Sequence, residues 1–234
     1  MINPGNEQSW DDQIQTMFAR IAKRYDLMNR LMTFGQDQRW RREVIRQARV
    51  PANGWLLDLG AGTGELGRQA LRAISGCHVI AADFTLEMMR TGKQQPNPAD
   101  VYWCSANALC LPYPDGTFDA IVSGFLLRNV GDIQQCLAEQ YRVLKPGGWL
   151  VALDTTRTTA GIFTPLVNFH LHTTIPFLGI WITGDKQAYS YLPASTERFL
   201  PAEELASCLL SAGFRQISFQ RYMFGTIAIH RGMK

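Results

Sequence analysis

One short segment, WLLDLGAGTGELG at residues 55–67, constrains the fold more than any other part of the chain. An apolar run ends at Asp58 and continues directly into Gly60, Gly62 and Gly64. Glycines at this spacing leave the backbone uncovered, and a helix that begins just after them turns its free N–H groups and positive dipole end toward the turn. We therefore expect a strand, a tight glycine turn and a helix that together bind a nucleotide-like cofactor.

The identity of that cofactor depends on the acidic residues around the turn. Gly62, Gly64 and Gly67 also match the G-x-G-x-x-G spacing of dinucleotide sites, with Asp83 at about the expected distance downstream. A pyrophosphate carries two negative charges, however, and would lie beside Asp58. The sulfonium and ammonium groups of S-adenosylmethionine suit that carboxylate, and Asp83 suits the hydroxyls of a ribose. These residues favour S-adenosylmethionine over a nicotinamide or flavin cofactor, and a turn without a ligand is the third interpretation.

The size and composition are those of one folded domain. The chain has 234 residues, of which 46% are hydrophobic and 18% charged, enough for one α/β domain and some added elements. A net charge of +3 and the lack of an aromatic-and-basic surface motif argue against nucleic acid as a partner. Five cysteines without a C-x-x-C pair indicate buried thiols in the cytoplasm, and the polar N-terminus does not resemble a signal peptide.

Strand and helix patterns alternate after residue 50 in the order that a parallel sheet requires. Apolar residues at helical spacing predict two helices before the first strand, one over residues 11–30 and one around 40–48. The KPGG segment should end a helix over 132–144 before the fifth strand. The other expected helices are one that begins at residue 65, one over 86–93 and one over 201–212. The expected strands are 55–59, 78–82, 101–104, 118–123, 149–153, 216–219 and 226–230.

Seven strands with a terminal hairpin suit a methyltransferase sheet better than a six-stranded dinucleotide fold. We expect a single Rossmann-like α/β domain with a mostly parallel seven-stranded sheet and helices on both faces. Its expected parts are an N-terminal helical cap (1–50), a cofactor-binding half (51–157), an apolar insertion (158–200) and a C-terminal helix with a strand hairpin (201–234).

Two segments carry unusual charge patterns. Residues 158–184 contain no Asp, Glu, Lys or Arg, but Pro165 and Pro176 argue against a membrane span. We expect this segment to cover an apolar ligand. The alternative is a pair of helices that pack against the core. Between Arg20 and Arg49, nine basic residues stand against three acidic ones. They form either a solvated helical face or a surface that contacts anionic lipid.

Motifs along nearly the whole chain resemble those of one enzyme family. GTG and KPGG occur in many methyltransferases, whereas RYDLMNRLMTFG, LRNV and the H-R-G-x-K ending are much narrower. ANALCLPYPDGTFD and YSYL add to the similarity. On these segments the chain resembles the quinone-biosynthesis C-methyltransferases, which methylate demethylmenaquinol and, in some members, a ubiquinol precursor. The resemblance implies S-adenosyl-L-methionine as the cofactor and a polyprenylated quinol as the substrate.

The resemblance also implies individual cofactor contacts. It places them at Thr63 in the turn, at Asp83, and at Asn107 with Ala108 after the third strand. Together with the residues of the turn, the expected cofactor-binding set is Asp58, Gly60, Gly62, Thr63, Gly64, Asp83, Phe84, Asn107 and Ala108. The chain departs from the family at Glu65, where relatives usually have Asp, and at Leu126, where they often have glycine. Leu126 is expected to narrow the pocket floor.

Methylation of a ring carbon requires an electron-rich, preferably deprotonated quinol held in a dry cleft. We expect Glu65 to pair with Arg128, the acid accepting the hydroxyl proton and the cation stabilising the phenolate. Asn129 is expected to hold one of these two groups, and Tyr25 to reach a quinol oxygen. The alternatives are a structural ion pair and a tyrosine of the amphipathic core. No cluster has metal-ligand spacing, and no metal is expected.

The sequence is compatible with two other functions. The chain could methylate another hydrophobic small molecule, such as a ubiquinol precursor or a tocopherol-like quinol, or it could be a non-catalytic cofactor-binding member of a quinone-synthesis complex. A cytoplasmic protein that contacts the inner face of the membrane through its basic N-terminal helices is expected. A homodimer is neither required nor excluded by the sequence.

Overall fold

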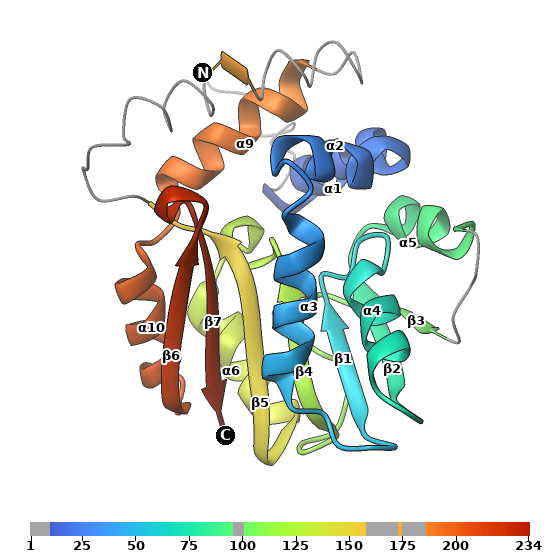
Figure 1. Ribbon diagram of the computed structural model, residues 1–234, viewed down its shortest axis with the longest axis vertical. Coiled ribbons are helices and arrows are strands. Elements are labelled where there is room, and N and C mark those ends of the chain that lie inside the picture. The colour runs from blue at the N-terminus through green and yellow to red at the C-terminus, as the bar shows by residue number, and fades with distance from the viewer. Residues whose placement is uncertain (1–9, 96–100, 158–172, 175–185) are drawn as a thin grey trace, which may run out of the picture.

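A seven-stranded sheet forms the centre of the molecule (Figure 1). The computed structural model describes residues 10–95, 101–157, 173–174 and 186–234. Strands β1 to β5 pair in parallel, and β7 runs antiparallel to both β5 and β6. In spatial order the strands are β3 (Val101–Ser105), β2 (His78–Asp83), β1 (Trp55–Leu59), β4 (Phe118–Gly124), β5 (Leu144–Thr155), β7 (Ile227–Met233) and β6 (Arg215–Tyr222). The expected fold class is confirmed.

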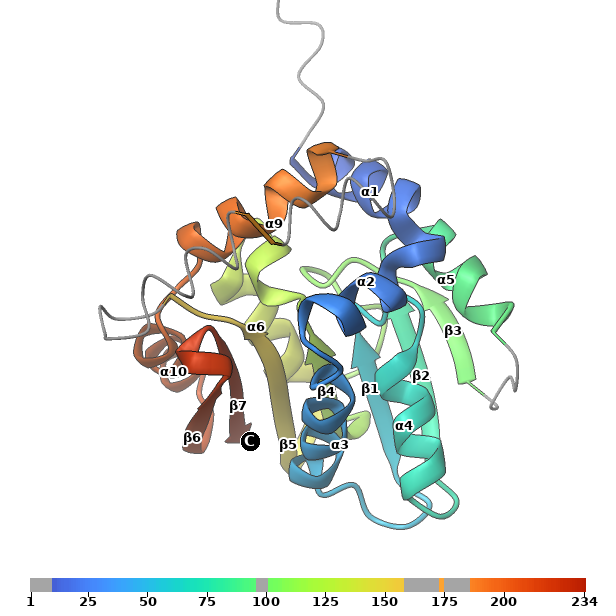
Figure 2. The same cartoon turned by 45° about the horizontal axis from the view of Figure 1, so that its top comes forward.

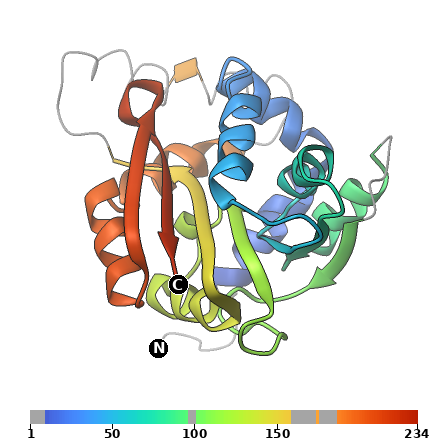
Figure 3. The same ribbon diagram turned by 60° about the horizontal axis from the view of Figure 1, so that its bottom comes forward.

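Helices cover both faces of this sheet (Figures 2 and 3). Helices α3 and α4 lie on one face, and α6 and α10 lie on the other. The described helices and 3₁₀ turns are α1 (Trp10–Ile21), η1 (Ala22–Arg24), α2 (Tyr25–Met32), α3 (Asp37–Ala48), α4 (Glu65–Ala73), α5 (Leu86–Lys93), η2 (Leu127–Asn129), α6 (Ile133–Val143), α9 (Lys186–Arg198), α10 (Ala202–Ser211) and η4 (Met223–Gly225).

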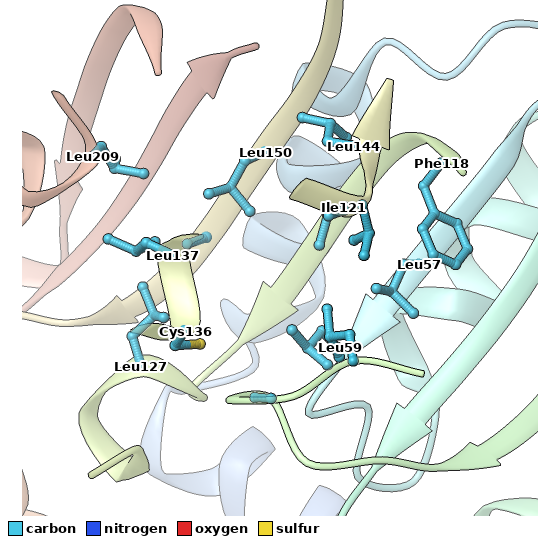
Figure 4. Close-up of a cluster of buried hydrophobic side chains, with 14 of the residues drawn as sticks. Leu57, Leu59, Phe118, Ile121, Leu127, Cys136, Leu137, Leu144, Leu150 and Leu209 are labelled. Atoms are coloured by element: carbon cyan, nitrogen blue, oxygen red, sulfur yellow. The ribbon is translucent and has the colours of Figure 1, made fainter. Parts of the chain in front are cut away.

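Alternate residues of each strand belong to two separate hydrophobic cores, because successive side chains point to opposite faces of a sheet. Leu57, Leu59 and Ile121 pack with α6 and α10 on one face (Figure 4). Leu56 and Val122, their neighbours in sequence, pack with α3 and α4 on the other. Both faces of the central strands are therefore dry, which explains why these strands read as continuous apolar runs.

Several predicted elements differ from the structure: β6 and β7 are longer than expected, α9 lies where no helix is predicted, and the first helix and β5 differ as follows. The helix expected over residues 11–30 is interrupted at η1, so that α1 and α2 are separate helices. The break redirects the chain, and α2 then reaches the glycine turn, where Asp26 binds Thr63. Strand β5 begins at Leu144, not at Trp149, because Leu144 pairs with Phe118 before a register shift. Helical periodicity does not report such long-range contacts.

The strand order reverses between β1 and β4, and ligands bind at such a switch point beside the carboxyl ends of the strands. Helices α1, α2 and α9 lie across that end of the sheet (Figure 2), and α1 contacts both α5 and α9. Most of the expected apolar insertion, residues 158–172 and 175–185, lies outside the described residues. Within the part of the chain that the structure describes, no helix has the length and apolar character needed to cross a membrane.

Candidate active site

The turn between β1 and α4 has a backbone that only glycine adopts easily. Gly60, Gly62 and Gly64 have φ values of 64°, 57° and 82°, in the left-handed region. Space is also restricted: a Cβ at Gly60 would lie 2.7 Å from Cδ1 of Leu126, and one at Gly64 would lie 2.7 Å from the Trp103 ring. The turn therefore presents bare backbone to the end of the sheet, as the sequence predicts.

Two carboxylates hold this turn, of which Asp58 is buried and Asp83 is partly buried at the cleft. Asp58 Oδ2 accepts a hydrogen bond from the Gly67 N–H at 2.8 Å, at the start of α4. Asp83 accepts from the Gly62 N–H and from the Thr85 N–H, both at 2.7 Å. Burial raises the pKa of both acids, that of Asp58 to about 7. The acids at the ends of β1 and β2 thus fix the turn through its backbone N–H groups.

A cleft that is open to solvent lies at the carboxyl ends of β1, β2 and β4. Its lining is mostly apolar and includes Met88, Leu109 and Val130. Six of the nine predicted cofactor-binding residues line it, namely Gly60, Gly62, Asp83, Phe84, Asn107 and Ala108. Leu126 also lines the cleft, at the position where the sequence predicts a narrowed floor.

The other three predicted cofactor-binding residues lie behind this lining. Asp58 is buried beneath α4, and Gly64 packs beside Trp103. Thr63 is buried, and its hydroxyl donates to Asp26 Oδ1 of α2 at 2.9 Å. The N-terminal helices reach the cleft from the other side as well, since Gln15 of α1 donates to the Phe84 carbonyl at 2.9 Å. The helical cap therefore touches the turn and the cleft rim directly.

The expected ion pair between Glu65 and Arg128 is wrong. Glu65 instead pairs with Arg68, one helical turn further along α4, at 2.7 Å. Burial alone would raise the pKa of the Glu65 carboxyl, but the hydrogen bond and charge of Arg68 lower it, so the group is ionised at neutral pH. Side chains three residues apart share a helix face, which explains why the local partner is chosen.

Arg128 belongs to a different buried pair. Its guanidinium donates to Asp154 Oδ1 at 2.6 Å, and its backbone N–H donates to Asp154 Oδ2 at 3.3 Å. The side chains are only 4% and 2% exposed, and the guanidinium lies over the Phe125 ring. Within the described residues, the Arg128 Nε atom has no hydrogen-bond partner. Asp154 lies near the end of β5, as Asp58 and Asp83 lie at the ends of β1 and β2, and this recurrence of acids at strand ends is visible in the sequence.

Asn129 and Tyr25 lie near this pair. Asn129 lines the cleft, donates to the Phe125 carbonyl at 2.8 Å and accepts from the Tyr191 hydroxyl at 2.9 Å. Asn129 therefore links η2 to α9. The sequence predicts instead that it holds Glu65 or Arg128. Burial raises the pKa of the Tyr25 hydroxyl, and the nearby charge of Arg128 opposes that shift. The structure brings Tyr25, Arg128 and Asn129 into one region and leaves Glu65 on the α4 side.

Comparison with known proteins agrees with this architecture. Residues 6–234 match the model of the ubiE/COQ5 methyltransferase family. The chain belongs to this family. A ubiquinone/menaquinone biosynthesis C-methyltransferase from Desulfotalea psychrophila is 45% identical over 221 residues, covering 94% of this chain and 90% of the relative. A demethylmenaquinone methyltransferase from Thermus thermophilus is 41% identical over 218 residues, covering 92% of this chain and 99% of the relative.

Solved structures of other methyltransferases share the fold of this ubiE/COQ5 family member. A SAM-dependent methyltransferase from Thermotoga maritima has a TM-score of 0.65 at 22% identity, covering 94% of this chain and 99% of that one. A phosphoethanolamine-type N-methyltransferase from Haemonchus contortus has a TM-score of 0.70 at 13% identity, covering 97% of this chain and 60% of that one. At these identities the likeness concerns the fold alone.

Proposed function

We propose that this protein transfers a methyl group from S-adenosylmethionine to a ring carbon of a polyprenylated demethylmenaquinol. The observation that carries the proposal is the apolar cleft between the glycine turn and η2, where a cofactor and a flat, greasy ring can lie side by side. The relatives are a ubiquinone/menaquinone biosynthesis C-methyltransferase and demethylmenaquinone methyltransferases, and their names support the same substrate class.

The residues of the cleft fit the proposed cofactor. Asp83 lines the cleft, and its oxygens keep lone pairs for ribose hydroxyls beside the two backbone bonds they already accept. Phe84, Met88 and Ala108 offer apolar surface to a purine. Asp58 Oδ1 is buried and, within the described residues, has no hydrogen-bond partner, so the turn keeps one acceptor open. S-adenosylmethionine supplies a methyl group on a positively charged sulfur.

The groups at the η2 side suit the quinol. Arg128 is held rigidly by Asp154, and a fixed guanidinium lowers the energy of a phenolate without having to reorganise. Arg128 lines a neighbouring pocket that shares Val130 with the cleft, so a ring oxygen at that border would meet the guanidinium. Glu65, ionised beside Arg68, is the proposed proton acceptor, and Asn129 and Tyr25 complete the proposed set.

Two variants test these roles. Arg128→Met should lower kcat by at least about 100-fold, the usual cost of removing one donor to a developing oxyanion. Glu65→Gln should lower kcat by about 100-fold through loss of a general base. Both should keep their affinity for the cofactor, measured by calorimetry. Near-normal turnover in both would remove these two residues from the chemistry.

The substrate is tested with the purified protein, a labelled methyl donor and a short-tailed demethylmenaquinol kept reduced. Label on the naphthoquinol ring carbon is the expected result, and the oxidised quinone should not react. Label on a ubiquinol precursor or a tocopherol-like quinol alone would indicate the second candidate substrate class. Cofactor binding without any transfer would indicate a non-catalytic member of a quinone-synthesis complex.

We further propose that α2 docks on an anionic membrane surface, where a polyprenylated quinol resides. Leu27, Leu31 and Phe34 are exposed and follow one another at helical spacing from α2 into the next turn. Lys23 of η1 and Arg30 of α2 are exposed beside them. Apolar side chains flanked by basic ones are typical of helices that lie in the membrane interface.

Flotation with vesicles of stated composition tests this surface. Binding to phosphatidylglycerol-containing vesicles at low salt, and weaker binding at high salt, are expected. The double variant Leu27→Gln with Leu31→Gln should lose binding, whereas Leu210→Gln, an exposed leucine on α10, should keep it. Equal binding of both variants would contradict α2 as the docking surface.

A further inference from the structure

Leu126 lies where the cleft meets the glycine turn. It follows Phe125 after the end of β4 and comes directly before η2. It lines the cleft together with Gly60, and a Cβ built at Gly60 would lie 2.7 Å from Cδ1 and 3.1 Å from Cβ of this leucine. The leucine side chain therefore fills the space beside the bare backbone of the turn. In the proposed function this is the border between the methyl donor and the quinol ring.

Hydrogen bonds around Leu126 hold its backbone in one conformation. The residue before it, Phe125, has a φ of 63°, which a bulky residue keeps only where its surroundings enforce it. The Phe125 N–H donates to the Leu153 carbonyl at 2.7 Å, and the Phe125 carbonyl accepts from Asn129 Nδ2 at 2.8 Å. The Leu126 carbonyl accepts from the Asn129 N–H at 2.8 Å, and the leucine side chain packs against the core on the α6 side. Leu126 is therefore a fixed wall of the cleft.

Apolar side chains of α1 form another wall of the same cleft. Ile14 and Phe18 line it from one face of that helix, because they are one helical turn apart. Helix α1 lies across the carboxyl end of the sheet (Figure 2). The Phe18 ring meets the Tyr25 ring edge-on, with the ring centroids 5.8 Å apart, which limits its movement. The cleft thus has apolar groups on the side of α1 and Leu126 on the side of the sheet.

We propose that Leu126 makes the acceptor site a slot for a flat ring, so that the enzyme selects a fused naphthoquinol over a benzoquinol with two adjacent methoxy groups. The inference rests on the proposed function, because it concerns the ring that receives the methyl group. The two fused rings of a naphthoquinol lie in one plane, and that plane can rest against the leucine. Adjacent methoxy groups crowd each other, and their methyl groups turn out of the ring plane. There they meet Leu126 and hold the reacting carbon beyond the roughly 3–3.5 Å at which reacting atoms must lie.

A comparison of two acceptors tests the proposal. Both are reduced quinols with the same short prenyl tail and a free ring carbon next to it, one a demethylmenaquinol and the other a 2,3-dimethoxybenzoquinol. The unmodified protein, given a labelled methyl donor, should prefer the naphthoquinol. Leu126→Ala should raise the ratio of kcat/KM for the dimethoxy ring to kcat/KM for the naphthoquinol by at least about 10-fold, because one methylene in an apolar site already discriminates by about 10- to 200-fold.

Three further variants make the test specific to this side chain. Leu126→Met keeps the volume and should keep the ratio. Leu126→Val removes less of the side chain than alanine does and should raise the ratio by a smaller amount. Leu109→Ala is the matched control and should change the ratio by less than about twofold. Leu109 is also partly buried, lines the same cleft and packs against the same core, but it follows β3 and not β4.

The ratio decides the outcome, because a loss of folded protein lowers both rates by the same factor. An unchanged ratio in Leu126→Ala and Leu126→Val, or an equal rise in Leu109→Ala, would overturn the proposal. Calorimetry with S-adenosylhomocysteine should give an affinity for Leu126→Ala within about twofold of the unmodified protein. Weaker binding together with an unchanged ratio would show that Leu126 shapes the site of the donor and not that of the ring. Absence of label on both acceptors in the unmodified protein would instead refute the proposed function.

Discussion

The pair formed by Arg128 and Asp154 offers a sharp test of how buried charge contributes to this fold. Asp154→Asn removes the negative charge and keeps the shape, so the Arg128 guanidinium stays buried without a counter-charge. Breaking one side of a buried pair costs about 3–5 kcal/mol, because the remaining ion has lost its water and its partner. In a domain of this length that loss corresponds to a fall in Tm of about 6–20 °C.

Equilibrium unfolding in urea, followed by circular dichroism, measures the effect. Glu203→Gln is the matched control: its carboxylate binds Arg221 at 2.6 Å, but the pair lies at the surface, where solvent screens it. The control should lose far less stability than Asp154→Asn. The double variant Arg128→Met with Asp154→Leu should regain most of the loss, because no uncompensated charge remains. Equal losses in Asp154→Asn and Glu203→Gln would refute the reasoning.

Two further predictions concern the glycine turn. The folded-state pKa of Asp58, about 7, lies above its unfolded value, so between those values only the folded protein holds the proton. The free energy of unfolding, relative to that of Asp58→Asn, should therefore fall by about 1.4 kcal/mol per pH unit as the pH rises from about 4.5 to 6.5. Urea midpoints of the two proteins that change in parallel with pH over that range would contradict this prediction. Gly64→Ala should lose more stability than Gly116→Ala. Both positions have positive φ, which costs about 1–2 kcal/mol, but only at Gly64 does the new Cβ meet the Trp103 ring. Thermal unfolding of the two variants measures the difference in stability. Equal losses of stability would show that the Trp103 ring moves aside without cost.

Much of the fold is predictable from the sequence because its signals are local. Apolar runs give the central strands, glycines give the turn, and acids at strand ends recur at Asp58 and Asp83. The interruption at η1 and the early start of β5 were missed, because both depend on contacts with distant segments. Six of the predicted cofactor-binding residues line the cleft for the same local reason: they directly follow the strands that end there.

The sequence does not predict the partners of the charged residues. Sequence alone determined which acids and cations stand near the carboxyl ends of the strands, since each follows an element whose direction is set by its neighbours in the chain. Only the tertiary structure decided that Arg128 binds Asp154, 26 residues away, and that Asp26 binds Thr63, 37 residues away. An ion pair or hydrogen bond depends on ångström distances between side chains, and those distances follow from how helices pack on the sheet.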